Sequence, residues 1–215
     1  MRKAIAMHNK NCIMRLSRYR SALANLKLLN FTRVFSDNLA DAAGTTSTQV
    51  RKDFSLFGLA GNRRGGYMVD DLIVQLDKIL GKDKVHKFIV IGTGNMGQAL
   101  LNYSGFEKNG IKILAGFDVK ESKYAPNAAI PILPMDQVKE FIAQNSVQLA
   151  IICVPSLAAP QVCDILLAVG IKGILNFAPI RLKERADCLI ENINLVTELE
   201  NIIYFVNALK KTESA

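Results

Sequence analysis

The chain has 215 residues, half of them hydrophobic, which gives room for one large domain or two small ones. No apolar run approaches the ~20 residues of a membrane-spanning helix, and no apolar signal-peptide core is present, so we expect a cytoplasmic protein without a membrane partner. The net charge of +8 is uneven: residues 1–80 carry 13 Lys and Arg against 6 Asp and Glu, and residues 81–215 carry 14 against 13. Binding to a phosphate backbone requires such a basic front segment.

The first stretch has basic residues but no acidic residue before Asp37. A mitochondrial presequence can have the same composition. Apolar residues that include Ile13, Leu16 and Leu23 give the stretch a core-facing side, so a folded basic helix over about residues 14–29 is favoured.

Two short helices are predicted next. One starts with Ser36 as its cap and ends at Gly44, a residue suited to a left-handed stop. The other starts at Thr46, has Gln49 three positions later in capping-box spacing, and runs to about Phe57.

Residues 58–67 are rich in Gly and Arg and predict a two-stranded wing, which a helix over about 69–80 follows. Arg63 and Arg64 at the wing tip are expected to reach a minor groove, where arginine responds to groove width. An exposed charged turn without function is the alternative. Arg15 and the two other arginines of the first helix are expected to touch phosphates.

The short helices have the spacing of a helix-turn-helix, with a small residue at Ala40, a glycine turn and an apolar anchor at Val50. At ~100° per residue, Phe54 and Phe57 share a side with Val50. The opposite side carries polar residues that can contact phosphates and base edges, although a solvated polar face is the alternative. The predicted DNA-binding residues on this side are Thr48, Arg51, Lys52 and Ser55.

From residue 87 onward, strand-like runs alternate with helical stretches, which predicts a parallel α/β sheet. The runs lie at 88–91, 111–117, 149–154, 173–177 and 189–196. A G-x-G-x-x-G loop follows the first run and opens a helix, the context in which glycines let the backbone approach a pyrophosphate. The loop residues predicted to bind a dinucleotide are Gly92, Thr93, Gly94, Asn95, Met96 and Gly97.

The second strand ends at Asp118, about 20 residues beyond the loop. An acidic residue there holds a ribose 2′-hydroxyl and favours NAD(H), while Lys120 and Lys123 leave a 2′-phosphate open. Two later strand exits are candidates for the nicotinamide end, with ordinary turns as the alternative. Their residues are Val154, Pro155, Asn176, Phe177 and Ala178.

The chain offers little of the chemistry that an enzyme or a metal site needs. No Tyr-x-x-x-Lys pair occurs, and neither His8 nor His86 lies at the carboxyl end of a predicted strand. Hydride transfer needs a positioned acid or base, so the cofactor is expected to bind as a ligand without reacting. Scattered cysteines favour reduced core thiols over zinc or disulfide chemistry, and they are Cys12, Cys153, Cys163 and Cys188.

Several stretches together form a pattern far more specific than a dinucleotide loop. They are residues 48–55, 65–67, 92–97, 101–103 with 105–106, 117–119 and 173–179. In these the chain resembles the Rex family of redox-sensing transcriptional repressors, over about residues 12–210.

The resemblance implies an N-terminal winged-helix DNA-binding domain at 1–81 and a Rossmann-like parallel α/β domain at 82–196. It also implies a homodimer whose C-terminal helix, in 197–215, is exchanged between subunits, and it adds Tyr103 to the cofactor-binding residues. Such repressors bind a palindromic operator, release it when NADH binds, and so sense the NADH/NAD⁺ ratio to control fermentation and respiration genes. The implied ligands are NADH and NAD⁺, with no catalysed reaction.

Two alternatives stay open beside this interpretation. One is a small NAD-dependent oxidoreductase with a basic interaction helix, and the other is a structural module that binds CoA or another nucleotide. Asn194 stands where the family usually has Asp, which is expected to change the strength of the NADH response. Met96, where the family often has Leu, is a mild change.

Overall fold

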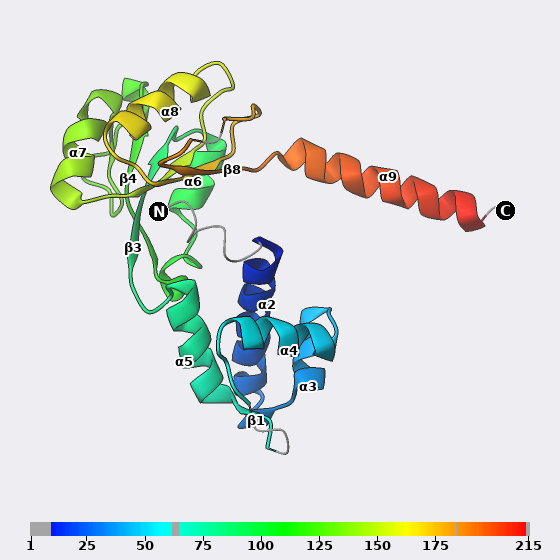
Figure 1. Ribbon diagram of the computed structural model, residues 1–215. Coiled ribbons are helices and arrows are strands. Elements are labelled where there is room, and N and C mark those ends of the chain that lie inside the picture. The colour runs from blue at the N-terminus through cyan, green and yellow to red at the C-terminus, as the bar shows by residue number, and fades with distance from the viewer. Residues whose placement is uncertain (1–9, 62–64, 184, 214–215) are drawn as a thin grey trace. The chain divides into compact units, whose positions relative to one another are not determined.

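The computed structural model describes residues 10–61, 65–183 and 185–213 (Figure 1). The chain divides into two compact units, the first ending at Lys84 and the second beginning at Val85. From the sequence we placed this boundary after residue 81.

Within its described residues, the first unit contains four helices and a small two-stranded sheet. Its elements are α2 (Lys10–Leu28), β1 (Arg33–Val34), α3 (Ser36–Ala43), α4 (Ser47–Leu56), β2 (Tyr67–Met68) and α5 (Val69–Leu80). Leu16 and Leu23 of α2 are fully buried with Phe54 of α4 and Leu76 of α5, so one core holds these three helices together. The first helix begins at Lys10, earlier than the apolar pattern indicated.

The ends of α3 and α4 can be compared with the capping residues expected from the sequence. The Thr46 side chain accepts a hydrogen bond from the Gln49 N–H at 3.2 Å, which confirms the cap of α4. Gly44 ends α3 with φ of 64°, as expected for a left-handed stop. The expected Ser36 cap is wrong by one residue: Phe35 takes the cap position and its N–H donates to Asn38 Oδ1, while Ser36 is buried.

The small sheet is formed differently from the predicted wing. The antiparallel partner of Tyr67 is Val34, from the segment after α2, and not a residue within 58–67. Val34 is fully buried in the helical core, which gives this short strand its place. Arg63 and Arg64 lie outside the described residues.

The second unit contains a six-stranded parallel sheet. Its strands are β3 (His86–Ile91), β4 (Ile111–Asp118), β5 (Ile132–Pro134), β6 (Leu149–Ile152), β7 (Gly173–Asn176) and β8 (Leu189–Asn192). Their order is β5-β4-β3-β6-β7-β8, which is the 3-2-1-4-5-6 order of a Rossmann fold. The parallel α/β prediction is therefore confirmed, whereas β5 was missed because it has only three residues and ends in proline.

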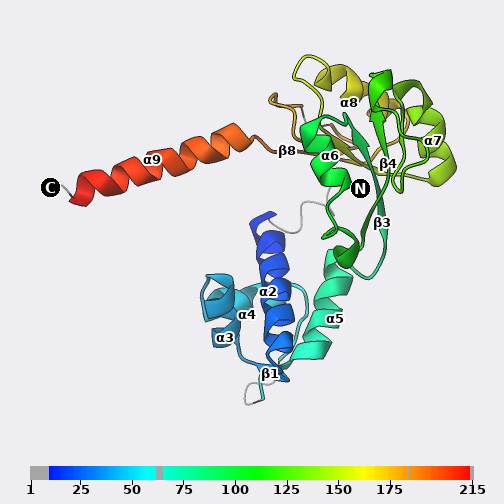
Figure 2. The ribbon, with the colours of Figure 1, turned by 180° about the vertical axis from the view of Figure 1, so that it is seen from behind.

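Helices cover both faces of this sheet (Figure 2). They are α6 (Asn95–Leu101), α7 (Val138–Asn145) and α8 (Ala159–Ala168), with short 3₁₀ turns η1 (Glu107–Asn109), η2 (Glu121–Lys123) and η3 (Met135–Gln137). Ile89 of β3 packs in the core with α7 and α8, and the next residue, Val90, packs with Leu101 of α6. This alternation along β3 is expected for a strand buried on both faces.

The last element is α9 (Leu195–Glu213), a 19-residue helix that begins two residues before the predicted one. Its described side chains through Lys210 are exposed, including Leu199, Ile203 and Val206 of the predicted apolar stripe. Within the described ranges, no helix is both long and apolar enough to cross a membrane.

Candidate nucleic-acid interface and nucleotide pocket

Helix α4 separates its residues into two faces as the helical spacing predicted. Val50 and Phe54 are fully buried, and Phe54 makes edge-to-face contacts with Tyr19 and Tyr67, with ring centroids at 5.5 and 5.2 Å. The side chains that are exposed on α4 include the four predicted DNA-binding residues, Thr48, Arg51, Lys52 and Ser55. Their binding to DNA stays a prediction.

A buried carboxylate ties α4 to α2. Asp53 accepts hydrogen bonds from Arg15 Nε at 2.6 Å, Arg15 Nη2 at 2.7 Å and Tyr19 Oη at 2.9 Å. Gln49 Nε2 donates to it at 2.8 Å and Cys12 Sγ at 3.2 Å. Gln49 therefore uses its side chain on Asp53, and no reciprocal bond to the Thr46 cap is formed by that amide.

The electrostatics of Asp53 follow from these contacts. Burial by itself would raise its pKa, but the hydrogen bonds from Arg15, Cys12, Gln49 and Tyr19 outweigh burial and lower the pKa to about 2. The carboxylate is thus ionised, and it raises the pKa of Arg15 in return. Burial, followed by the hydrogen bond to Asp53, raises the pKa of Tyr19 to about 12.

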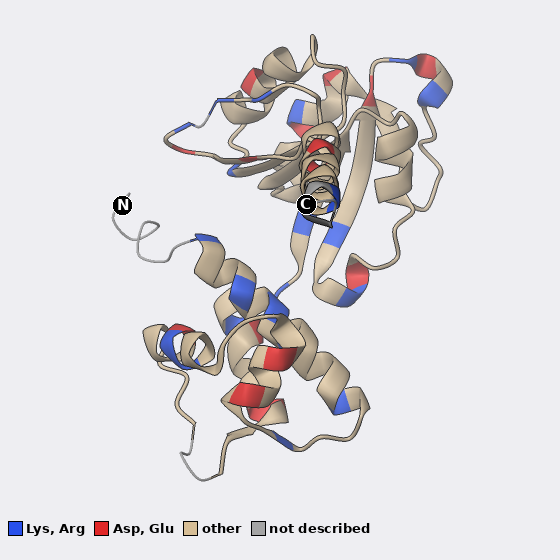
Figure 3. Cartoon of the chain, turned by 90° about the vertical axis from the view of Figure 1, so that its right-hand side faces the viewer, with Lys and Arg blue, Asp and Glu red and all other residues tan. Residues whose placement is uncertain are grey.

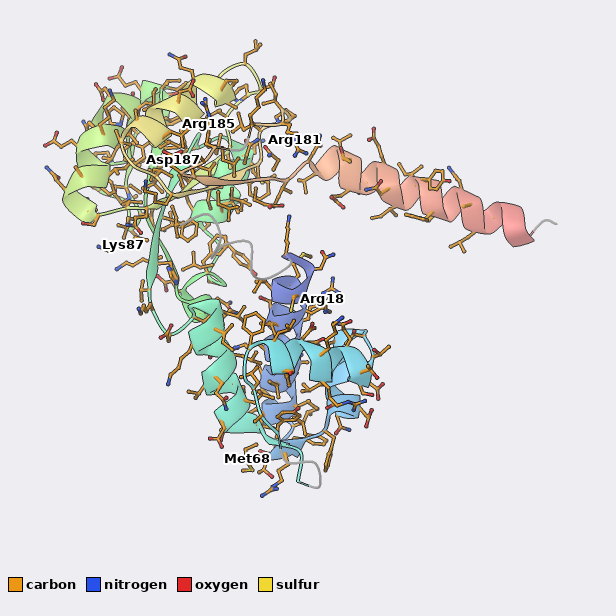
Figure 4. All side chains as sticks on the ribbon, viewed as in Figure 1. Arg18, Met68, Lys87, Arg181, Arg185 and Asp187 are labelled. Atoms are coloured by element: carbon orange, nitrogen blue, oxygen red, sulfur yellow. The ribbon has the colours of Figure 1, made fainter. Side chains whose placement is uncertain are left out.

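This arrangement gives Arg15 a structural role. Two of its guanidinium nitrogens donate to Asp53 and so hold α4 against α2. The phosphate contact expected of Arg15 stays a prediction. Arg20 is likewise bound to Asp77 of α5 at 2.8 and 3.0 Å. Arg18 is exposed on α2 (Figure 4) and has no ion pair within the described part of the chain. It is the stronger phosphate candidate of the three.

The charge pattern of α2 keeps its basic character in spite of these pairs. The helix carries Lys and Arg but no acidic residue, so blue positions and no red ones lie along it in Figure 3. Lys27, near the end of α2, pairs with Asp70 at 2.6 Å. Both side chains are largely exposed, so the pair contributes little to the stability of the fold.

The glycine-rich loop lies between β3 and α6. Gly92 has φ of 90° and donates its N–H to the Phe117 carbonyl at 2.8 Å, which brings the loop against β4. A Cβ on Gly97 would overlap the Gly92 carbonyl oxygen, whereas a Cβ on Gly94 would meet nothing within 4 Å. Gly97 is thus required for packing, and Gly94 leaves open space for a ligand.

A cavity of about 550 Å³ opens beyond the carboxyl ends of the strands, next to this loop. Its size is in the range of small-molecule and cofactor sites, and this edge of the sheet is where open α/β folds bind ligands. Seven of the predicted cofactor-binding residues line it, and these are Gly92, Gly94, Met96, Asp118, Val154, Pro155 and Phe177.

Asp118 lines the cavity and is also hydrogen-bonded to the glycine-rich loop. Its Oδ2 accepts hydrogen bonds from the Thr93 N–H at 2.8 Å and the Thr93 hydroxyl at 2.9 Å, and its Oδ1 accepts one from the Lys120 N–H at 3.0 Å. Burial opposes ionisation, but these bonds prevail and lower the pKa of Asp118. The Thr93 side chain is therefore turned to Asp118 and is fully buried.

Three predicted residues have other positions. Asn176 is fully buried, donates to the Ile180 carbonyl at 2.8 Å and accepts from the Ala178 N–H at 3.0 Å, so it shapes the exit of β7. Ala178 is buried and lines a different hollow. Tyr103 lies outside the cavity lining, exposed against Phe106 at a centroid distance of 4.9 Å. None of the three lines the cavity, and their assignment to the cofactor site stays a prediction.

Asn95 and Gly97 also lie outside the lining, the first as the initial residue of α6 and the second packed under Gly92. Cys153 was expected to be a core thiol, but it lines the cavity, and burial raises its pKa to about 11. Its place directly after β6 was the signal that sequence reasoning overlooked. Among the described residues, no group of three or more His, Cys, Asp or Glu could hold a metal ion.

Asn194 has a clear local role. Its Oδ1 accepts from the Val196 N–H at 3.0 Å and the Thr197 N–H at 3.4 Å, so it caps the first turn of α9. The amide thus keeps the capping contact that an aspartate would make, without the negative charge.

The fold and the two sites define a class of two-unit protein. The first unit is a helix-turn-helix with an exposed polar helix, and the second is a Rossmann unit with a dinucleotide-type pocket. Two family models match these parts. Residues 10–55 match a model described as a putative DNA-binding protein N-terminus, and residues 83–180 match one described as a CoA binding domain.

Close relatives cover nearly the whole chain. It is 39% identical to the redox-sensing transcriptional repressor Rex of Caldanaerobacter subterraneus subsp. tengcongensis, over 91% of this chain and 88% of that protein. It is 37% identical to Rex of Caldicellulosiruptor saccharolyticus, over 94% of both. The chain belongs to the Rex family of redox-sensing transcriptional repressors.

Solved structures agree with this family. The chain is 35% identical to RSP, a Rex-family repressor, and superposes on its complex with NAD⁺ and operator DNA with a TM-score of 0.90, over 96% of both chains. The TM-score is 0.85 for the RSP complex with NADH, over 96% of this chain and 98% of that one.

Proposed function

We propose that this chain is a redox-sensing transcriptional repressor that binds operator DNA through its first unit and releases it when NADH fills the cavity of its second. One observation carries the proposal: a glycine-loop cavity and an exposed polar recognition helix occur in one chain of a family with structures bound to NAD⁺, NADH and operator DNA. The palindromic form of the operator and the control of fermentation and respiration genes come from the family resemblance alone.

The DNA contacts are assigned to the exposed face of α4. Arg51 can bond bidentately to guanine, and Lys52 can meet guanine or a phosphate. Thr48 and Ser55 offer hydroxyls to phosphates and base edges. Arg18 on α2 supplies a further phosphate contact, because it is exposed and Arg15 is committed to Asp53. Arg63 and Arg64 of the wing stay candidates from the sequence.

The cofactor contacts follow from the cavity lining. Gly94 leaves room for the pyrophosphate, and Asp118 lies at the ribose end. Val154, Pro155 and Phe177 make the other end apolar. An apolar, partly buried pocket disfavours the charged nicotinamide of NAD⁺ relative to the neutral ring of NADH, because burying an unpaired charge is costly. We infer that the chain responds to NADH in preference to NAD⁺.

In this proposal the binding of NADH and the binding of operator DNA are thermodynamically linked. If NADH weakens operator binding by a given factor, operator DNA must weaken NADH binding by the same factor. The bound nucleotide acts as a ligand in this scheme, and we propose that the chain is not an enzyme. We also propose that it forms a homodimer by burying the apolar stripe of α9, whose Leu199, Ile203 and Val206 are exposed in the single chain. We further propose that it acts in the cytoplasm.

A fluorescence-anisotropy titration tests the proposal. A labelled palindromic DNA is saturated with protein, and NADH and NAD⁺ are then added in separate experiments. We expect NADH to release the DNA at concentrations where NAD⁺ does not. Operator affinity that is indifferent to NADH at every NADH/NAD⁺ ratio would refute the sensor. Steady NADH consumption with a carbonyl substrate would support the oxidoreductase alternative instead.

A further inference from the structure

Two lysines line the ribose end of the cavity. Lys120 and Lys123 belong to the segment that directly follows β4, together with Asp118 and Val119, and all four residues contribute to the lining. Both lysine side chains are exposed, and neither has an ion pair within the part of the chain that the structure describes. The pocket therefore presents two uncompensated ammonium groups where the adenosine ribose of a nucleotide would lie.

The acidic residue at this end of the cavity, Asp118, already accepts hydrogen bonds from the protein itself. In an NAD-type site the acidic residue after the second strand accepts the ribose hydroxyls. Here Asp118 accepts three hydrogen bonds from Thr93 and the Lys120 N–H, out of about four acceptor positions on a carboxylate. Glu121, the other acidic residue of the segment, is exposed and lies outside the cavity lining. Two positive charges thus face one largely engaged negative charge.

We propose that this end of the cavity accepts an adenine nucleotide whose ribose carries a phosphate, with Lys120 and Lys123 as the groups that bind it. Lysine is a point charge that suits phosphate, and an unpaired ammonium gains a charge-assisted hydrogen bond there. This inference rests on the proposed nucleotide-binding function of the same pocket. It goes beyond that function by adding a second class of ligand to NADH.

Two metabolite classes share this chemistry. NADPH carries the phosphate on the ribose 2′-oxygen, and CoA carries it on the 3′-oxygen. The family model that matches residues 83–180 is described as a CoA binding domain, which is why the 3′-phosphate belongs in the test beside the 2′-phosphate.

The experiment compares three fragments that differ only in the ribose phosphate. Adenosine 2′,5′-bisphosphate, adenosine 3′,5′-bisphosphate and 5′-AMP are titrated into the full-length protein by calorimetry, and NADH is titrated in parallel. We expect at least one bisphosphate to bind about tenfold more tightly than 5′-AMP, the scale of a hydrogen bond between charged groups. A preference for the 2′-isomer assigns NADPH, and a preference for the 3′-isomer assigns CoA.

A double variant and a matched control locate the effect. Lys120→Ala with Lys123→Ala is expected to remove the tenfold preference, so that both bisphosphates bind about as tightly as 5′-AMP. Lys112→Ala removes one exposed positive charge from β4, outside the cavity lining, and is expected to keep the preference. Loss of the preference in Lys112→Ala as well would overturn the assignment to the two lysines.

The two failures are distinguishable. If NADH binds and 5′-AMP binds as tightly as both bisphosphates, the phosphate inference is overturned and the proposed function stands. If NADH itself does not bind, the proposed function fails first, and the inference falls with it.

Discussion

Arg15 of α2 and Asp53 of α4 are joined by two hydrogen bonds, Nε to Oδ2 at 2.6 Å and Nη2 to Oδ1 at 2.7 Å. The Asp53 side chain is 1% exposed and that of Arg15 is 26% exposed, so the pair is shielded from water mainly on the acidic side. It fixes the inner face of the helix whose outer face carries Arg51 and Lys52. A buried ion pair of this kind adds little net stability, but removing one partner is costly because the other charge is left without compensation.

Asp53→Asn is expected to destabilise the first unit by roughly 3 kcal/mol, at the low end for a broken buried pair because Arg15 can still reach water. Urea unfolding measures the change. Asp70→Asn is the control, since it removes an exposed partner of Lys27 and is expected to cost less than about 1 kcal/mol. Equal losses in the two variants would show that Asp53 is no more important than a surface charge.

The same carboxylate predicts a dependence of stability on pH. The pKa of Asp53 is about 2 in the folded chain, below its ordinary value of 3.8. Its contribution to stability is therefore fully present above about pH 4 and is lost as the pH falls toward 2. Unfolding curves at pH 2–6 measure this slope. Asp53→Asn should show a shallower slope, and an unchanged slope would contradict the assignment.

Arg51→Ala is expected to weaken operator binding by about 1–3 kcal/mol, because a bidentate contact to a base is lost, and to leave NADH binding unchanged. Lys52→Ala, if it contacts phosphate, should lower affinity for all DNA sequences and reduce the salt slope by about 1. Both are measured by anisotropy at several salt concentrations. Lys78→Ala removes an exposed lysine of α5 and should have no comparable effect.

Two glycine variants separate packing from ligand access. Gly94→Ala places its Cβ in open space, so we expect an unchanged melting temperature and a loss of NADH affinity of about tenfold or more from crowding of the pyrophosphate. Gly97→Ala places its Cβ on the Gly92 carbonyl, so we expect the melting temperature itself to fall. Thermal melts and NADH fluorescence measure the two effects. Wild-type NADH affinity in Gly94→Ala would place the pyrophosphate elsewhere.

Asn194→Ala is expected to lower the stability of α9 by about 1 kcal/mol, because the side chain that accepts from Val196 and Thr197 is lost. Asn194→Asp keeps the acceptor and adds a negative charge at the helix N-terminus, which favours the helix by about 0.3–1 kcal/mol. Circular dichroism during thermal unfolding compares the two. A helix content that is the same in both variants would rule out the capping role.

Local patterns were sufficient for much of this protein. The helix that spans Val69–Leu80 and the cap at Thr46 were read from the sequence, because helical periodicity and capping depend on neighbouring residues. The exposed and buried faces of α4 followed from helix geometry in the same way. The glycine loop could be placed between β3 and α6 because its strand and its helix are adjacent in the chain.

Contacts between distant residues could not be read in this way. Val34 pairs with Tyr67, and Arg15 pairs with Asp53, although the local sequence around each residue does not indicate its partner. Asn176 is the last residue of β7, at the edge of the sheet where a ligand-binding residue is expected, but its hydrogen bonds with Ile180 and Ala178 hold its side chain inside the protein.

The sequence by itself determined the alternation of strands and helices in the second unit, the basic front end and the G-x-G-x-x-G loop, since these depend on composition and on spacing along the chain. Only the tertiary structure decided which side chains meet in space. It assigned Arg15 to Asp53, committed Asp118 to Thr93 and gave Lys120 and Lys123 a place on the cavity wall, because burial and hydrogen bonding across elements select one arrangement of side chains among many.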